Sequence, residues 1–182
     1  MQVIFYLLLI LLLAFGGFII YLAYNIYHDN NNVLPLLTGL VKVGLLIYII
    51  ASVIITIAVL FYINDELVIT SMIIKQIIVT LYFIVIYKLS SKLLENLSSD
   101  VIFDDENVQL TKQLGLQFLY LSITEIVIGI LFGIIVFSSV GTFNIATNNT
   151  IFVYVVIGLV LQIVALILKK ATRIYEENKL TI

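Results

Sequence analysis

The sequence predicts an all-α membrane protein: a polytopic helix bundle with five transmembrane helices, in a single integral membrane domain over residues 1–182. Hydrophobic residues make up 63% of the chain and charged residues only 11%, whereas a soluble domain is about 45–50% apolar and about 25% charged. The apolar residues form continuous runs rather than alternating positions, which is typical of membrane helices and not of membrane β-strands.

Five apolar runs are expected to span the bilayer, because each has roughly the 20 residues that cross a ~30 Å hydrocarbon core. They cover residues 3–24, 40–63, 68–91, 114–137 and 151–168. Only Met1 and Gln2 precede the first run. It therefore lacks the basic segment of a signal peptide, and we expect it to be retained as a helix.

The basic residues predict the orientation of these spans. Five spans put segments 25–39, 92–113 and 169–182 on one side of the membrane, and eight of the nine Lys and Arg residues lie on or beside that side. They are Lys42, Lys88, Lys92, Lys112, Lys169, Lys170, Arg173 and Lys179. The positive-inside rule then places the N-terminus outside and the C-terminus in the cytoplasm. Abundant Ile, Asn, Lys and Tyr are typical of a low-GC bacterial genome, so the expected location is the bacterial cytoplasmic (inner) membrane.

The long polar break between the third and fourth runs contains a helix start. Asp104 is a typical N-cap residue, and Asp105 and Glu106 then place negative charge in the first helical turn, where the helix dipole favours it. Phe103 and Val108 have the spacing of a hydrophobic staple around that cap. We therefore predict a helix that begins here in water and continues into the fourth run.

Two charged residues lie inside predicted spans, Lys75 in the third and Glu125 in the fourth. Charges at membrane depth are costly and face a bundle interior, where they find partners. We expect the two at comparable depth, as an ion pair that fixes how two helices meet; the alternative is a proton or ion pathway. Gly129 and Gly133 form a GxxxG pattern that favours close helix packing and leaves a homo-oligomer open. Gln162 is expected to bridge helices.

Residue patterns for catalysis or for cofactor and metal binding are missing from the sequence. The chain has no cysteine and one histidine, His28, without carboxylates at ligand spacing, and no nucleotide-binding loop or nucleophile elbow occurs. We therefore expect a protein that is not an enzyme and that holds no cofactor or metal. A net charge of -2 gives no reason to expect direct nucleic-acid binding.

Two segments together resemble a family of bacterial membrane proteins, the domain-of-unknown-function 2975 family. Residues 103–108, Phe-Asp-Asp-Glu-Asn-Val, with Leu110, Leu114 and Gly115, are similar to its signature PF-T-x-E-N-V-x-x-L-x-x-I-G. Residues 175–182, Tyr-Glu-Glu-Asn-Lys-Leu-Thr-Ile, are similar to its ending E-E-N-D-L-T-I/V. The resemblance covers about residues 72–182. The chain departs from the pattern at Ile102, where proline is usual, at residues 109–113, and at Lys179, where an acid is usual.

The resemblance implies a small multi-pass protein without established enzymatic activity, of a kind often encoded beside a small helix-turn-helix regulator. The chain is thus expected to bind, and to sequester or inhibit, a cytoplasmic DNA-binding regulator. The expected contact residues are Phe103, Asp104, Asp105, Glu106, Asn107, Glu176, Glu177, Asn178, Leu180 and Ile182. Two alternatives stay open: a small transporter or immunity-type protein that uses Glu125 and Lys75, and a structural subunit of a membrane complex.

Overall fold

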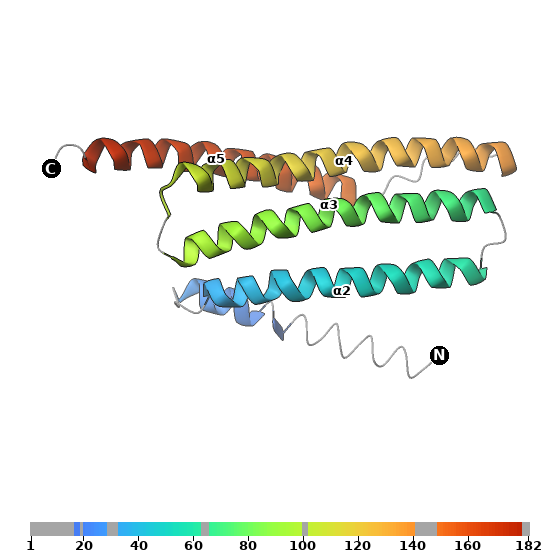
Figure 1. Cartoon of the computed structure of the whole chain (residues 1–182), viewed down its shortest axis with the longest axis horizontal. Coiled ribbons are helices and arrows are strands. Elements are labelled where there is room, and N and C mark those ends of the chain that lie inside the picture. Colours follow the sequence, from blue (N-terminus) through green and yellow to red (C-terminus); the bar gives the residue numbers. More distant parts are fainter. Residues whose placement is uncertain are drawn as a thin grey trace. The chain divides into compact units, whose positions relative to one another are not determined.

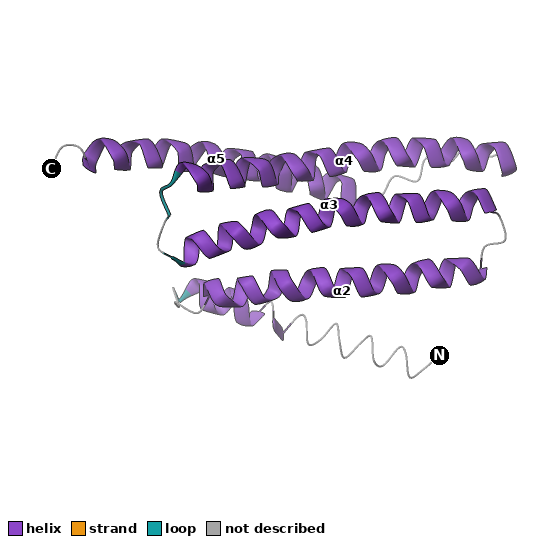
Figure 2. Cartoon of the chain, viewed as in Figure 1, coloured by secondary structure: helices purple, strands orange, loops and turns teal. Residues whose placement is uncertain are grey.

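The regular structure of the chain is helical. The computed structural model describes residues 17–18, 20–28, 33–62, 66–99, 102–140 and 149–179, and all the regular elements within these ranges are helices (Figure 2). The long ones are α2 (Val33–Tyr62), α3 (Glu66–Ser98), α4 (Asp105–Val140) and α5 (Thr150–Lys179). The chain forms two compact units, Met1–Leu40 and Val41–Ile182.

Among the described residues, three helices are long and apolar enough to cross a membrane: Glu66–Ser98, Asp105–Ile135 and Thr150–Lys179. They match the third, fourth and fifth expected spans, and the all-α membrane architecture is confirmed at this level. The second expected span, 40–63, falls on α2, in which the described apolar segment is the shorter Leu36–Ala51. The first, 3–24, lies largely outside the described residues.

The helices extend beyond the apolar runs that predicted them. The 36 residues of α4 make a helix about 54 Å long at ~1.5 Å per residue, well over the ~30 Å of a hydrocarbon core. α3 likewise continues past residue 91, and α5 past residue 168. The helical hydrogen bonds persist into the polar segments because those segments also pack against their neighbours.

The core of the second unit lies between α3 and α4, which run antiparallel (Figure 1). Val79 and Ile86 of α3 meet Leu114 and Leu121 of α4, and Leu121 is fully buried. Partly buried aromatic and aliphatic side chains of α3, α4 and the flanking helices α2 and α5 pack around these four residues: Tyr48, Tyr82, Phe83, Leu89, Phe118, Tyr154 and Leu161.

α4 and α5 approach each other closely at two glycines. A Cβ atom at Gly158 would lie 2.7 Å from Leu119 Cγ, and one at Gly115 would lie 2.9 Å from the carbonyl oxygen of Gly158. Within this contact Gln162 Nε2 donates a hydrogen bond to the carbonyl oxygen of Lys112 at 2.8 Å. The predicted bridging role of Gln162 thus corresponds to a side chain-to-backbone bond between α4 and α5.

We predict that Gly115→Ala lowers the melting temperature of the detergent-solubilised protein. The added methyl group would meet backbone atoms of α5, so the two helices must move apart, at a cost of about 1–3 kcal/mol. The matched control is Gly44→Ala in α2, where an added Cβ has no atom within 4 Å. That substitution should be neutral or stabilising by up to ~1 kcal/mol, because alanine favours the helix. Equal melting of the two variants would contradict the close contact.

Candidate functional site

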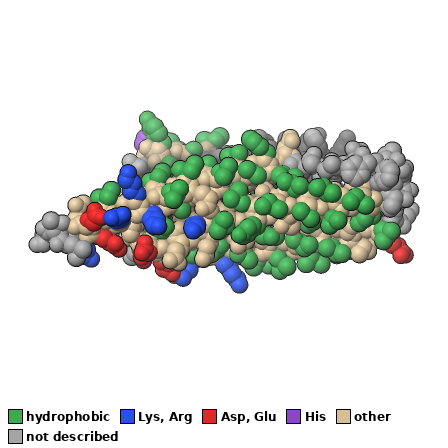
Figure 3. Space-filling model, turned by 90° about the horizontal axis from the view of Figure 1, so that it is seen from above, with side chains coloured by type: hydrophobic (Ala, Val, Ile, Leu, Met, Phe, Trp, Pro, Cys, Tyr) green, Lys and Arg blue, Asp and Glu red, His purple; other side chains and the backbone are tan. Residues whose placement is uncertain are grey.

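Charged side chains gather where α3 ends, α4 begins and α5 ends, while hydrophobic side chains cover most of the remaining visible face (Figure 3). We call this region the polar end. The Lys and Arg residues described there are Lys88, Lys92, Lys112, Lys169, Lys170, Arg173 and Lys179. The acidic residues described there are Glu95, Asp104, Asp105, Glu106, Glu176 and Glu177.

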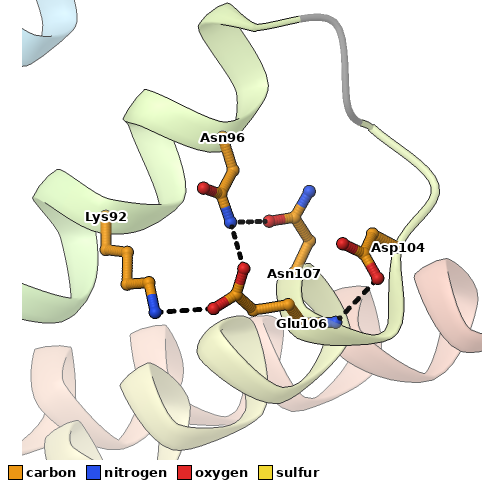
Figure 4. A network of polar contacts seen from close by, with 5 residues as sticks. All are labelled: Lys92, Asn96, Asp104, Glu106 and Asn107. Carbon is orange, nitrogen blue, oxygen red and sulfur yellow. Dashed lines mark hydrogen bonds and ion pairs between the residues drawn. The ribbon is translucent and has the colours of Figure 1, made fainter.

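Asn107 is the centre of a hydrogen-bond network at the polar end (Figure 4). Its side chain is fully buried. Asn107 Oδ1 accepts a bond from Asn96 Nδ2 of α3 at 2.9 Å, and Asn107 Nδ2 donates to the carbonyl oxygen of Ile102 at 3.2 Å. The amide therefore links α3 and the first turn of α4 to the connector, by which we mean the segment between Ser98 and Asp105. Thr111 Oγ1 adds a bond to the carbonyl oxygen of Asn107 at 2.7 Å.

Glu106 completes this network on the solvent side. Its carboxylate forms an ion pair with Lys92 and accepts a bond from Asn96 Nδ2 at 3.1 Å (Figure 4). The Lys92 ammonium and the Asn96 amide hold the pKa of the Glu106 carboxyl below its ordinary value, and Glu106 raises the pKa of Lys92. Both side chains are exposed, so the pair contributes little to stability and chiefly orients the carboxylate.

The helix start that the sequence predicted is present. α4 begins at Asp105, and Asp104 Oδ1 accepts a bond from the backbone N–H of Glu106 at 3.3 Å. The backbone N–H of Val108 donates to the Asp104 carbonyl oxygen at 3.3 Å, as the first turn requires. Asp104 is thus occupied as a cap, whereas Asp105 is exposed.

The connector also touches the end of α5. The ring of Phe103 stacks on that of Tyr175, with centroids 5.7 Å apart and planes inclined by 29°. This contact brings Asp104 and Asp105 into the same region as Glu176 and Glu177, which follow Tyr175 directly. Two residues of the predicted contact surface, Leu180 and Ile182, lie outside the described residues. Asn178, also on that surface, is exposed on the last turn of α5.

Sequence reasoning did not single out Lys92 and Asn96, although a signal existed. Lys88, Lys92 and Asn96 recur every four residues and therefore lie on one face of α3. Once α3 is extended to Ser98, that face can meet the start of α4. Because the third span was predicted to end at residue 91, Lys92 and Asn96 were not expected to lie on the same helix face as Lys88.

A second cluster lies at the level of the apolar segments. The structure brings Lys75 and Glu125 together, with Nζ 3.1 Å from Oε2, across α3 and α4. The Glu125 side chain is only 10% exposed and that of Lys75 is 40% exposed, so the carboxylate is the buried member. Glu125 also interacts electrostatically with Tyr48 of α2 and Tyr154 of α5. The carboxylate is therefore paired across α3 and α4 and lies within electrostatic range of hydroxyl groups on α2 and α5.

Two further polar contacts flank this ion pair, and the sequence did not single them out. The hydroxyl groups of Tyr82 and Thr124 lie 3.0 Å apart between α3 and α4. Gln76 Nε2 donates to the Tyr48 hydroxyl at 3.3 Å, between α3 and α2. The hydroxyl groups of Tyr82, Thr124 and Tyr48 and the Gln76 amide thus each have a protein partner, as a low-dielectric surrounding demands.

Gly129 and Gly133, the residues of the predicted GxxxG pattern, are both buried on α4. Within the described ranges, the His, Asp and Glu residues form no group of three that could hold a metal ion.

Comparison with known protein families gives a match. The model of a family described as "Protein of unknown function (DUF2975)" matches residues 63–182. That range includes α3, α4, α5 and both segments that carry the resemblance. No curated protein and no solved structure matches the chain.

We predict that Asn107→Leu destabilises the protein by about 1–3 kcal/mol, since it removes the donor to the Ile102 carbonyl group and the buried one of the two acceptors of the Asn96 amide. The measurement is thermal unfolding in detergent. Gln109→Leu is the matched control, because Gln109 is an exposed neighbour on the same turn and its replacement should change stability by less than ~0.5 kcal/mol. A melting curve of Asn107→Leu that overlays the wild type would refute the central role of this amide.

We also predict an asymmetry at the Lys75–Glu125 pair. Lys75→Met leaves a buried carboxylate unpaired and should cost about 3–5 kcal/mol. Glu125→Gln should cost less, because Lys75 is partly exposed and its long stem can move the ammonium group outwards. The double variant should be more stable than Lys75→Met alone. Unfolding of the three variants measures the order, and equal effects of the two single substitutions would disprove the asymmetry.

Proposed function

The chain belongs to the family of proteins of unknown function called DUF2975, and we propose that it is a non-enzymatic, five-span protein of the bacterial cytoplasmic membrane that binds a DNA-binding regulator. In this proposal the N-terminus is outside and the polar end lies in the cytoplasm, in agreement with the positive-inside rule. The family resemblance implies the regulator, and the exposed carboxylates at the polar end support the proposal.

The observation that carries the proposal is the Phe103–Tyr175 stack. It joins the start of α4 to the end of α5, and these are the two segments whose sequences resemble the family signatures. The joined segments present exposed carboxylates from both helices, among them Asp105 and Glu176. Phe103 itself is 43% exposed and offers an apolar anchor beside the acidic groups.

A DNA-binding regulator fits such a surface by charge. Its basic residues neutralise phosphates when it binds DNA, and the same residues can pair with carboxylates on the membrane protein. Electrostatic complementarity of this kind raises the association rate and selects the partner. Binding at the polar end would then keep the regulator from DNA, because both ligands compete for one basic surface.

The Lys75–Glu125 pair, whose carboxylate is buried, favours a second candidate function, that of a transporter or immunity-type protein acting within the membrane. The two proposals differ in which substitutions matter. A partner-binding protein depends on the polar end, whereas a transporter depends on Glu125 even when the polar end is altered. A structural subunit would co-purify with a membrane complex instead.

We predict that Asp105→Lys combined with Glu176→Lys reduces capture of the regulator by on the order of tenfold, since like charges then face its basic surface. The regulator encoded nearest to the gene is the ligand, and capture is measured on the solubilised membrane protein at equal abundance.

The matched control for this experiment is Glu66→Lys. Glu66 is also exposed and acidic, but it begins α3 at the helix end opposite to the polar end. The Glu66→Lys variant should capture as much regulator as the wild type does. Asp104 is left unchanged because it caps α4. If the wild type captures no regulator, or if the charge-reversed variant captures it equally well, the proposal fails.

A further inference from the structure

At the polar end, the apolar surface of α5 extends further along the bundle than the apolar surfaces of α3 and α4. The relative register of the three helices shows this difference. The pairs Lys75–Glu125 and Asn96–Asn107 fix α3 against α4 and place Lys88 at about the level of Lys112. These two exposed lysines mark one common boundary of the apolar surface on α3 and α4. The bond from Gln162 to the Lys112 carbonyl oxygen places Gln162 at that same level on α5.

The apolar surface of α5 continues past this boundary. The first basic residue of α5 after Gln162 is Lys169, seven positions on, which is about 10 Å further along the helix at ~1.5 Å per residue. In this interval Ile163, Leu166 and Ile167 are 57%, 69% and 62% exposed. Beside them, α4 exposes the polar side chain of Gln109.

These three residues continue the outward stripe of the membrane-spanning part of α5. Phe152, Leu159 and Ile163 lie at i, i+7 and i+11, so they share one helix face, and all three are exposed. Gly158, Ala165 and Thr172 mark the opposite, buried face. The exposed apolar residues beyond the boundary thus belong to the face that meets lipid further along the same helix.

Basic residues follow directly on this surface. Lys169, Lys170 and Arg173 are all exposed. Arg173 pairs with Glu177 at 2.9 Å, whereas Lys169 and Lys170 form no ion pair with any residue that the structure describes. A surface with apolar residues on one side and cations on the other matches the boundary between acyl chains and anionic headgroups.

We propose that Ile163, Leu166, Ile167, Lys169, Lys170 and Arg173, which we call the α5 ledge, are embedded in the interfacial layer of the leaflet at the polar end and bind anionic phospholipid headgroups. The apolar members enter the acyl region, and the lysine ammonium groups extend to the phosphates. The proposal rests on insertion of α3, α4 and α5 in a membrane and not on a regulator.

The depth of the ledge can be tested with single cysteines, because the natural chain has none. Ile167→Cys and, as a matched control on α4, Gln109→Cys are labelled with an environment-sensitive fluorophore and reconstituted as the full chain. The vesicles contain phosphatidylcholine with phosphatidylglycerol. We expect lipid-borne quenchers to quench the label at residue 167 and a water-soluble quencher to reach the label at residue 109. A label at residue 167 that is as open to the aqueous quencher as the control overturns the proposal.

Headgroup selectivity tests the charged part of the ledge. Spin-labelled phosphatidylglycerol and phosphatidylcholine are compared for their association with the wild type and with Lys169→Gln plus Lys170→Gln. Each lysine should contribute a preference for the anionic lipid of up to about fivefold at low salt, and the double variant should lose it. Equal selectivity of the two proteins overturns headgroup binding. A residue-167 label that becomes protected only when a cytoplasmic protein is added would assign the ledge to a protein partner and would also overturn it.

Discussion

The close approach of α4 and α5 at Gly115 and Gly158 is the contact on which the arrangement of the polar end depends. Because no side chain separates the two backbones there, the helices can lie in only a narrow range of registers. That register lets Gln162 reach the Lys112 carbonyl oxygen and lets Tyr175 reach Phe103. A shift of one helical turn, about 5.4 Å, would remove both contacts.

The α3–α4 interface is organised differently. Here the apolar core around Leu121 is accompanied by polar contacts along its length, from Lys75–Glu125 through Tyr82–Thr124 to Asn96–Asn107. In lipid, apolar packing does not distinguish one helix neighbour from another, whereas each polar group needs its own partner. These pairs therefore specify which faces of α3 and α4 meet and at which register.

α5 carries two different surfaces as it leaves the apolar layer. One side faces α4 and the connector through Ala165, Thr172 and the ring of Tyr175. The other carries the exposed apolar and basic residues of the α5 ledge. The protein contact on the first side fixes the orientation of α5 relative to α4, and the second side is the one for which we propose contact with lipid.

Many residues of the candidate site could be predicted from local sequence, whereas the contacts that join α3, α4 and α5 at that site could not. Asp104 as a helix cap follows from its chemistry and its place before two acidic residues. Lys75 and Glu125 stand out because charge is rare in apolar runs. By contrast, Asn96 and Lys92 gain meaning only when α3 continues to Ser98, and the stack of Phe103 on Tyr175 joins residues 72 positions apart. No local pattern encodes such a contact.

The sequence by itself determined that the chain is helical and suited to a membrane, because hydrophobic run length and composition act locally and additively. It also determined where α4 begins, since capping involves only neighbouring residues. The tertiary structure alone decided how far the helices extend, which glycines meet and how α5 is displaced relative to α3 and α4. These features depend on the relative register of separate helices. Register is set by close backbone contact and by polar pairing between residues distant in sequence. Both are contacts between two helices, so the local sequence of one helix does not determine them.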